Sequence, residues 1–350
     1  MLKMEPFKLT LPDSSIISGR YSFPSRDAKS SHVRPLIVCI PGGSYDSQYF
    51  DVDGAQSIVG LSTSLNIPVI ALDRPGYGAS TPIANIENAS TYAQNQGRYL
   101  NSTILPALWK AFAKRAQAPA IVLLSHSIGA MIATISAGSY TGAEPYPLAG
   151  LITSGIGTQL VEGPRQGMVH LLHEATEVIH FEPAPKDAIT LQLPHMNLAP
   201  LRMCRFTEQL NRPVPCGELR DINLTWLEYW KQYSSKVKVP LLYGLGEFDG
   251  LWTCSLETMH EYKAAFPQSP NVTCEIIPMA PHCMELSFQS QAWYLKCFAF
   301  AIECITSQSL RSTIQPTDDS EKSVSLARGI ITTVYTTSYG DTLLEREATD

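Results

Sequence analysis

The 350-residue sequence lacks any apolar run close to the roughly 20 residues that cross a bilayer, so no membrane span is expected. The N-terminal segment Met1–Pro6 has none of the apolar character of a signal peptide, and we therefore expect a cytoplasmic location. The sequence also has no dense run of Lys and Arg, and its formal net charge is -6. A nucleic-acid partner is therefore not expected.

Motifs for metals and cofactors are missing as well. None of the eight cysteines forms a CxxC pair, which argues against a zinc ribbon or a redox motif, and we interpret them as reduced thiols. His170 and His173 could share one face of a helix, but no third ligand follows at a fitting spacing. Gly76-Tyr77-Gly78 lacks the third glycine of a dinucleotide-binding loop. We expect no metal and no cofactor.

The sequence does contain short apolar runs, rich in β-branched residues and bounded by turn residues, which are typical of buried strands. They cover residues 35–40, 67–72, 120–124, 148–153, 239–243 and 272–277. Two alternating segments before them, 7–12 and 16–23, indicate a hairpin. Segments of helical composition lie between most of the runs, at residues 55–65, 91–116, 128–137, 255–266 and 285–305. This alternation predicts an α/β fold with a mainly parallel central sheet flanked by helices.

One interval interrupts the alternation. Residues 157–238 contain no strong strand run, and we interpret them as a helical cap insertion over the end of the sheet where ligands bind. The α/β core would then consist of residues 1–156 and 239–306. The polar tail 307–350 is expected to be peripheral or partly disordered, with a possible lone strand at 330–335.

The strongest chemical signal is Ser125-His126-Ser127-Ile128-Gly129, which follows a buried strand and opens a helix of small and apolar residues. A nucleophile elbow needs this strand–turn–helix context, with small residues two positions before and after the serine. Gly129 meets that need, and Ser125 replaces the usual first glycine with another small residue. The pattern predicts Ser127 as a nucleophile, with the side chain of His126 pointing elsewhere.

A serine hydroxyl needs a base to take its proton and a carboxylate to orient that base. Of the eight histidines, His282 alone follows a late strand in a loop and precedes the last helix, which makes it the expected base. Asp249 and Glu247 both follow the preceding strand. The spacing from Gly246 favours Asp249, and Glu247 is the alternative acid. The chain order of serine, acid and histidine is the one expected of the α/β-hydrolase fold.

An acyl-transfer reaction also needs two donors for the oxyanion of the tetrahedral intermediate. The amide of Ile128, directly after the predicted nucleophile, is one candidate. The second should come from the glycine-containing turn Pro41–Tyr45, where Gly43 is our choice and Ser44 is the next candidate.

Together these residues resemble the α/β-hydrolase superfamily, in particular its cap-bearing esterase and peptidase-like members. Ile40-Pro41-Gly42-Gly43-Ser44 is similar to the oxyanion loop of that family, with Pro41 where a histidine is common. The segment 71–80 is similar to the D-x-x-G-x-G-x-S stretch, which is usually structural. Ser127 stands where epoxide hydrolases and haloalkane dehalogenases, which have a similar layout, use aspartate. The overall character is similar to hydrolases of fungal natural-product pathways, which implies a role in secondary-metabolite biosynthesis.

The functional hypothesis is a cofactor-free serine hydrolase that forms an acyl-enzyme with a carboxylic ester, lactone or thioester. The aromatic content of the cap suggests a pocket for a mid-sized, largely apolar small molecule, although each aromatic could pack the cap core instead. These aromatics are Phe206, Trp226, Tyr229 and Trp230. Two alternatives stay open: an acyltransferase, cyclase or lyase that uses the same triad, and a non-catalytic small-molecule receptor. The sequence does not indicate the oligomeric state.

Overall fold

The computed structural model describes residues 3–25, 33–83, 90–175 and 177–313. The chain divides into two units, Met1–Thr306 and Ser307–Asp350, and the first contains the sheet and the candidate site. The lone strand expected at 330–335 lies outside the described residues.

An eight-stranded sheet in the order β1-β2-β4-β3-β5-β6-β9-β10 forms the centre of the first unit. Strand β2 runs antiparallel to β1 and to β4, and every other neighbouring pair is parallel. The strands are β1 (Glu5–Thr10), β2 (Ile16–Ser22), β3 (Leu36–Ile40), β4 (Val69–Asp73), β5 (Ile121–His126), β6 (Leu148–Ser154), β9 (Leu241–Phe248) and β10 (Val272–Pro281). The predicted hairpin and the predicted mainly parallel sheet are confirmed.

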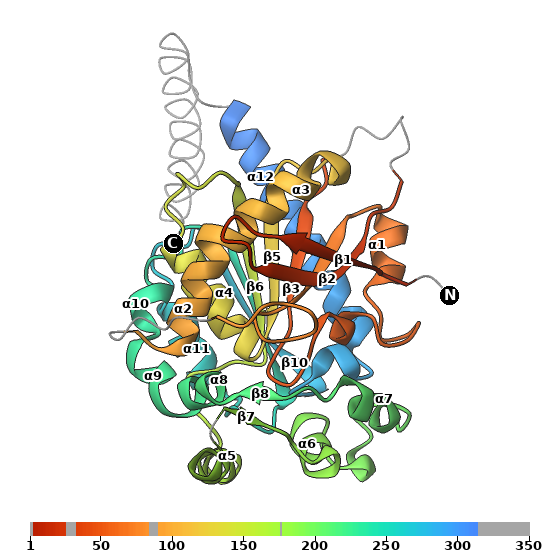
Figure 1. Cartoon of the computed structure of the whole chain (residues 1–350), viewed down its shortest axis with the longest axis vertical. Coiled ribbons are helices and arrows are strands. Elements are labelled where there is room, and N and C mark those ends of the chain that lie inside the picture. Colours follow the sequence, from red (N-terminus) through yellow and green to blue (C-terminus); the bar gives the residue numbers. More distant parts are fainter. Residues whose placement is uncertain (1–2, 26–32, 84–89, 176, 314–350) are drawn as a thin grey trace, which may run out of the picture. The chain divides into compact units, whose positions relative to one another are not determined.

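Helices cover both faces of this sheet (Figure 1). Successive side chains of a strand point to opposite faces, so a wholly apolar strand needs a core on each side. Strand β3 shows this: Leu36 and Val38 pack in one cluster with α2, α3 and α4, whereas Ile37 and Cys39 pack in a second cluster with α1 and α12. The helices of the two layers are α1 (Val59–Leu65), α2 (Tyr92–Tyr99), α3 (Leu105–Ala116), α4 (Ile128–Ser139), α11 (Leu256–Ala264) and α12 (Ser290–Thr313), and a π-helical turn, η2 (Leu100–Ile104), joins α2 to α3.

The helix expected at 55–65 is shorter than predicted. Asp51 and Ser57 form an isolated antiparallel bridge, and the Ser57 hydroxyl donates to the Asp51 carboxylate at 2.8 Å. This bridge holds residues 51–57 in a bend, so α1 begins only at Val59. At the other end of the chain, α12 continues past the predicted end at residue 305 to Thr313.

The segment 157–238 contains short helices and a small antiparallel ribbon that the sequence does not indicate. Its helices are α5 (Glu162–Glu174), α6 (Pro183–Thr190), α7 (Met203–Leu210), α8 (Cys216–Arg220), α9 (Trp226–Tyr229) and α10 (Lys231–Ser234), and its ribbon pairs β7 (Val178–Ile179) with β8 (Val214–Pro215). The remaining short turns of the chain are η1 (Ser47–Phe50), η3 (Pro194–Met196), η4 (Asp221–Thr225) and η5 (Met284–Leu286). Helices α5, α6 and α7 lie together at the bottom of Figure 1, beyond one end of the sheet.

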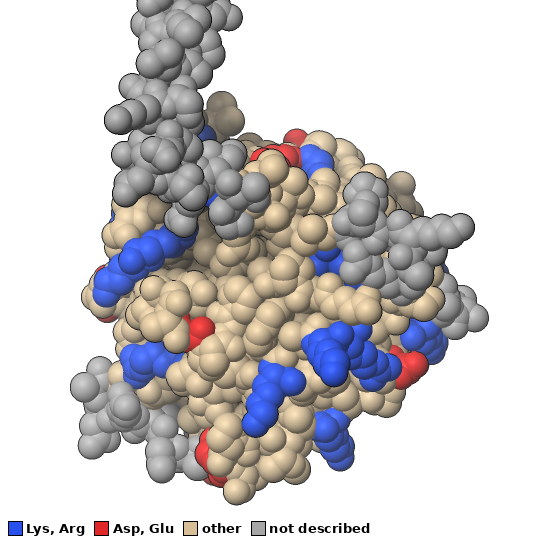
Figure 2. Space-filling view, turned by 90° about the horizontal axis from the view of Figure 1, so that it is seen from above, with Lys and Arg blue, Asp and Glu red and all other residues tan. Residues whose placement is uncertain are grey.

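The surface carries few charged groups for its size. On the face seen in Figure 2, Lys and Arg side chains are scattered among uncharged residues, in keeping with a sequence that is only 17% charged. Within the described part of the chain, no helix is both long enough and apolar enough to pass through a membrane.

Candidate active site

Ser127 occupies a sharp turn between β5 and α4. Its backbone angles φ and ψ are 54° and −124°. Residues other than glycine adopt this backbone conformation only when the surrounding structure enforces it. Gly129 makes this turn possible, because a Cβ there would lie 2.3 Å from the carbonyl oxygen of Ile40 and 2.4 Å from that of Pro41. The strand, the strained serine and the close approach have the geometry of a nucleophile elbow.

His282 and Asp249 lie next to this serine, although they come from two other strand ends. Asp249 follows β9, and His282 follows β10. The Nε2 atom of His282 is 3.1 Å from Ser127 Oγ, and its Nδ1 atom is 2.8 Å from Asp249 Oδ2. The structure therefore brings the predicted nucleophile, base and acid into one hydrogen-bonded chain.

The two candidate acids have different surroundings. The side chain of Asp249 is fully buried, and its Oδ1 atom accepts from the amides of Leu251 and Trp252 at 2.8 and 3.0 Å. Glu247 is exposed, and its carboxylate accepts from the amide of Met279 at 2.9 Å. Only Asp249 contacts His282, so the geometry favours it over Glu247 as the partner of the imidazole.

The turn after β3 lies against the elbow. A Cβ at Gly42 would be 2.9 Å from the Cβ of Ser127, and a Cβ at Gly43 would be 2.7 Å from the side chain of Ile128. The absence of side chains therefore lets this backbone approach the serine closely. Ser44 is the poorer candidate donor, since its amide faces the hydroxyl of Tyr77 at 3.4 Å.

Arg74 holds this turn in place, a function that the sequence analysis missed. Its Nε and Nη2 atoms donate to the carbonyl oxygens of Pro41 and Gly42 at 2.9 and 3.0 Å, and its Nη1 atom forms a buried ion pair with Glu218 of α8. Glu218 also accepts from Tyr77 at 2.8 Å. Arg74 was visible in the sequence only as part of the stretch read as structural, and nothing there indicated a partner so far along the chain.

A second buried histidine, His126, lies beside His282. The ring of His126 is 4.8 Å from that of His282 between centroids and stacks on Tyr49 at 5.1 Å. Its Nδ1 atom is 3.0 Å from the hydroxyl of Ser154 and 3.4 Å from the carboxylate of Glu285. Burial, and to a lesser degree the nearby His282, lowers the pKa of His126 well below its ordinary value, so this imidazole is neutral.

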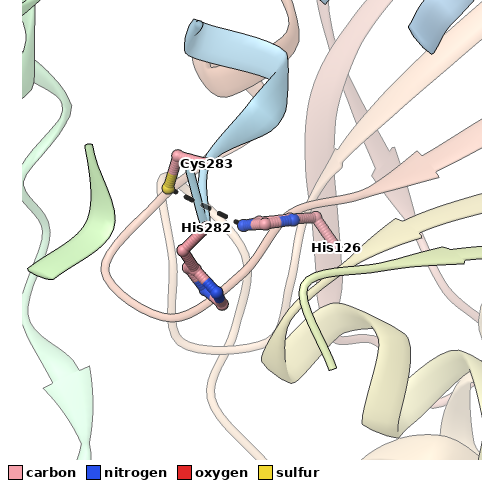
Figure 3. A group of neighbouring side chains, drawn as sticks. All are labelled: His126, His282 and Cys283. Atoms are coloured by element: carbon pink, nitrogen blue, oxygen red, sulfur yellow. Dashed lines mark hydrogen bonds between the residues drawn. The ribbon is translucent and has the colours of Figure 1, made fainter. Parts of the chain in front are cut away.

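His126, His282 and Cys283 also form the one group of potential metal ligands found among the described residues. Figure 3 shows the ring of His126 directed at the sulfur of Cys283, 3.7 Å away. This set fits a metal poorly, because both ring nitrogens of His282 already have protein partners. Burial raises the pKa of Cys283 to about 12, which keeps its thiol protonated instead of the thiolate that binds metals.

A cavity of about 560 Å³ opens beside Ser127 and His282, a size typical of small-molecule sites. Its wall combines the turn at residues 42–45 with parts of the segment 157–238, and it is largely apolar. Apolar lining residues include Leu160, Met168, Leu171, Val214, Leu219 and Trp252.

The four aromatics of the segment 157–238 that the sequence analysis names do not line this cavity. Trp226, Tyr229 and Trp230 are buried in the core on the α4 side of the sheet, where Trp230 stacks on Tyr262 of α11. Phe206 packs against the core on the opposite side. The structure therefore favours the alternative that these aromatics pack in a core, which their helical spacing alone could not decide.

Comparisons with known proteins agree with this architecture. A search of curated proteins finds no match. Among solved structures, a soluble variant of monoglyceride lipase from Saccharomyces cerevisiae is 14% identical, covers 86% of this chain and 96% of its own, and has a TM-score of 0.60. An esterase from Exiguobacterium antarcticum is 13% identical, covers 84% of this chain and 98% of its own, and has a TM-score of 0.55. Both are similar in fold. Residues 37–290, more than half of the chain, match the alpha/beta hydrolase family. The chain therefore belongs to that family.

Proposed function

We propose that this protein is a serine hydrolase that cleaves a carboxylic ester, lactone or thioester of a mid-sized, largely apolar molecule. The observation that carries the proposal is the hydrogen-bonded chain from Ser127 through His282 to Asp249, with contacts of 3.1 and 2.8 Å, at the wall of an apolar cavity. No cofactor is needed for this chemistry.

In the proposed mechanism, Ser127 Oγ attacks the substrate carbonyl while His282 Nε2 takes the hydroxyl proton. Asp249 accepts from Nδ1, which selects the productive tautomer and stabilises the imidazolium that forms. The amides of Gly43 and Ile128 donate to the oxyanion. His282 then protonates the leaving group, and a water activated by His282 releases the acyl group from Ser127.

We also propose that the segment 157–238 is the cap that selects the substrate. Helices α5 and α6 contribute Met168, Leu171 and Ile189 to the cavity wall. A cavity that is lined mainly by carbon favours an apolar acyl or alcohol group, since its walls offer few hydrogen bonds to a polar one. A role in secondary-metabolite biosynthesis stays a prediction, which the neighbouring genes would test.

The test combines a covalent probe with a substitution. A fluorophosphonate should label the wild-type protein at Ser127, and Ser127→Ala should abolish both the labelling and the hydrolysis of short-chain aryl esters. Ser139→Ala, at the far end of the same helix, is the matched control and should leave both intact. Full-rate hydrolysis by Ser127→Ala would reject the mechanism, and an unlabelled wild-type serine would favour a receptor.

The same protein can be used to separate hydrolysis from acyl transfer or cyclisation. Turnover in isotopically labelled water should place the label in the acid product. An unlabelled acyl product would show that the acyl-enzyme passes to an acceptor other than water.

A further inference from the structure

The wall of the cavity contains a buried ammonium group. Lys186 of α6 lines the cavity and is only 6% exposed. Its Nζ atom donates to Asn211 Oδ1 at 3.1 Å and lies 3.9 Å from the ring centroid of Tyr45, two residues beyond Gly43. Both partners are uncharged, and Lys186 forms no ion pair with any carboxylate of the described residues.

This lack of a counterion is unusual for a buried cation. Removing an ammonium from water is costly, and buried lysines are therefore normally paired. Arg74, the buried cation behind the oxyanion turn, is neutralised by Glu218. Asp187, the chain neighbour of Lys186, instead accepts from the Thr207 hydroxyl at 2.7 Å. Among the described residues, the Lys186 ammonium therefore has no direct ion pair, and the Asp187 carboxylate acts on it only at longer range.

Groups from three elements surround Nζ: Tyr45 after β3, Asp187 of α6 and Cys283 after β10. Burial lowers the pKa of Lys186 to about 8, and Cys283 and Asp187 oppose this shift only in part. Burial also raises the pKa of Tyr45 well above its ordinary value, and that of Cys283 to about 12, so both are neutral at neutral pH. The amine is therefore mostly charged at neutral pH and loses its proton in mildly alkaline solution.

Few other charges reach the cavity. Glu182 and His180 line it, but both side chains are exposed to solvent, which screens the Glu182 carboxylate. His126 is kept neutral by burial. Among the described residues that line the cavity, Lys186 is thus the one buried lysine, arginine or carboxylate side chain. Of the three N–H donors of this ammonium, one donates to Asn211 Oδ1 and another can face the Tyr45 ring, which leaves one donor for a ligand.

We propose that Lys186 binds a carboxylate of the substrate, so that the preferred substrate is an apolar ester, lactone or thioester carrying a carboxylate away from the scissile carbonyl. The carboxylate supplies the missing counterion, and the apolar wall holds the chain between the two groups. This inference rests on the proposed hydrolase function and goes beyond it by naming the substrate class.

The test compares two aryl esters of equal length, one an aryl monoester of a dicarboxylic acid and the other its analogue with a terminal methyl group in place of the carboxylate. Several chain lengths are used so that one can span the distance from Ser127 to Lys186. The measured quantity is the ratio of kcat/KM for the acidic ester to kcat/KM for the neutral ester. Lys186→Met should lower this ratio about 10- to 100-fold, the effect of losing one charge-assisted hydrogen bond. Lys236→Met removes an exposed lysine of the same segment and should leave the ratio at its wild-type value.

A pH series gives an independent readout on the wild-type protein. The ratio should fall as the pH rises through about 8, because kcat/KM reports the ionisation of the free enzyme, and it should stay flat in Lys186→Met. A wild-type ratio that is constant on both sides of that pH, or an equal ratio in Lys186→Met, would overturn the proposal. Fluorophosphonate labelling of wild-type Ser127 separates the failures: a labelled protein with an unchanged ratio rejects only the carboxylate site, whereas an unlabelled protein rejects the hydrolase function with it.

Discussion

The buried pair between Arg74 and Glu218 gives the most quantitative prediction, through the substitution Glu218→Gln. The two side chains are 2% and 0% exposed, so neither can recover its hydration when the other is changed. Glu218 accepts from Arg74, from Tyr77 at 2.8 Å and from Gln96 at 2.5 Å. A glutamine keeps the shape and can keep most of these hydrogen bonds, because the Tyr77 hydroxyl can turn to accept. What it loses is the negative charge opposite the guanidinium.

Breaking a buried ion pair from one side costs about 3–5 kcal/mol, and we expect the lower end because the hydrogen bonds survive. Glu218→Gln should therefore lower the free energy of unfolding by about 3 kcal/mol, or the melting temperature by roughly 4 °C for a chain of this size. Activity towards an aryl ester should fall only about tenfold, because Arg74 still donates to the carbonyl oxygens of Pro41 and Gly42. Loss of a whole oxyanion donor would cost roughly 100- to 1000-fold.

Urea unfolding and aryl-ester kinetics measure the two effects. The control is Glu162→Gln, which makes the same change in an exposed pair with Arg165 and should cost under about 1 kcal/mol. If Glu218→Gln is as harmless as the control, then the pair is not desolvated and Arg74 needs no counterion. That result would also weaken the argument that an unpaired Lys186 must find its partner in a ligand.

Three further predictions concern the site. Asp249→Asn should lower kcat roughly 1000- to 10000-fold without a comparable loss of melting temperature. Glu247→Gln should have little effect on kcat. A larger loss of kcat in Glu247→Gln than in Asp249→Asn would reassign the acid to Glu247. Gly129→Ala places a methyl group against the carbonyls of Ile40 and Pro41, so urea unfolding should show a loss of about 3 kcal/mol, while Gly60→Ala, with open space around it, should cost nothing. Lys186→Met should raise the free energy of unfolding by up to about 3 kcal/mol at neutral pH, since the lysine pKa falls from 10.5 to about 8 on folding. Both states of the wild type are protonated below pH 8, so this gain should be largest there and vanish as the pH approaches about 10.5, and a gain that does not depend on pH would contradict it.

The sequence predicts the strands and the elbow because consecutive residues determine them. The elbow is indicated by neighbouring residues alone: an apolar run before Ser127, the small Gly129 and the helix that follows. No contact with a distant segment is needed to interpret this pattern. The prediction of His282 and Asp249 has a similar basis, since each stands directly after a strand and parallel strands end at the same edge of a sheet. The choice between Asp249 and Glu247 depends on side-chain direction, which sequence spacing only suggests.

The features that sequence analysis missed depend on contacts between distant segments. Arg74 and Glu218 are 144 positions apart, and only the folded chain shows that they meet beside the turn at residues 41–45. The sequence left open whether Trp226 and Trp230 line a pocket or pack in a core. In the fold, Trp230 stacks on Tyr262 of α11 and Trp226 packs against Trp230. Nothing in the sequence distinguishes Lys186 from other lysines, because a single lysine in a helix is normally exposed. Burial is a property of the tertiary structure, and the contacts of each of these residues depend on burial. The sequence alone therefore does not show them.

Burial also determines how charge is distributed around the proposed triad. In the proposed mechanism His282 becomes an imidazolium, and a second charged imidazole 4.8 Å away would oppose that step. Burial and His282 keep His126 neutral, and burial raises the pKa of Glu285 against the hydrogen bonds from Ser154 and Tyr49. The cluster behind His282 is therefore poorly able to hold charge. Stabilisation of the imidazolium is left to Asp249, whose own negative charge is held by two backbone amides. The charge of Lys186 lies instead in the cavity wall, where we propose that it acts on the substrate.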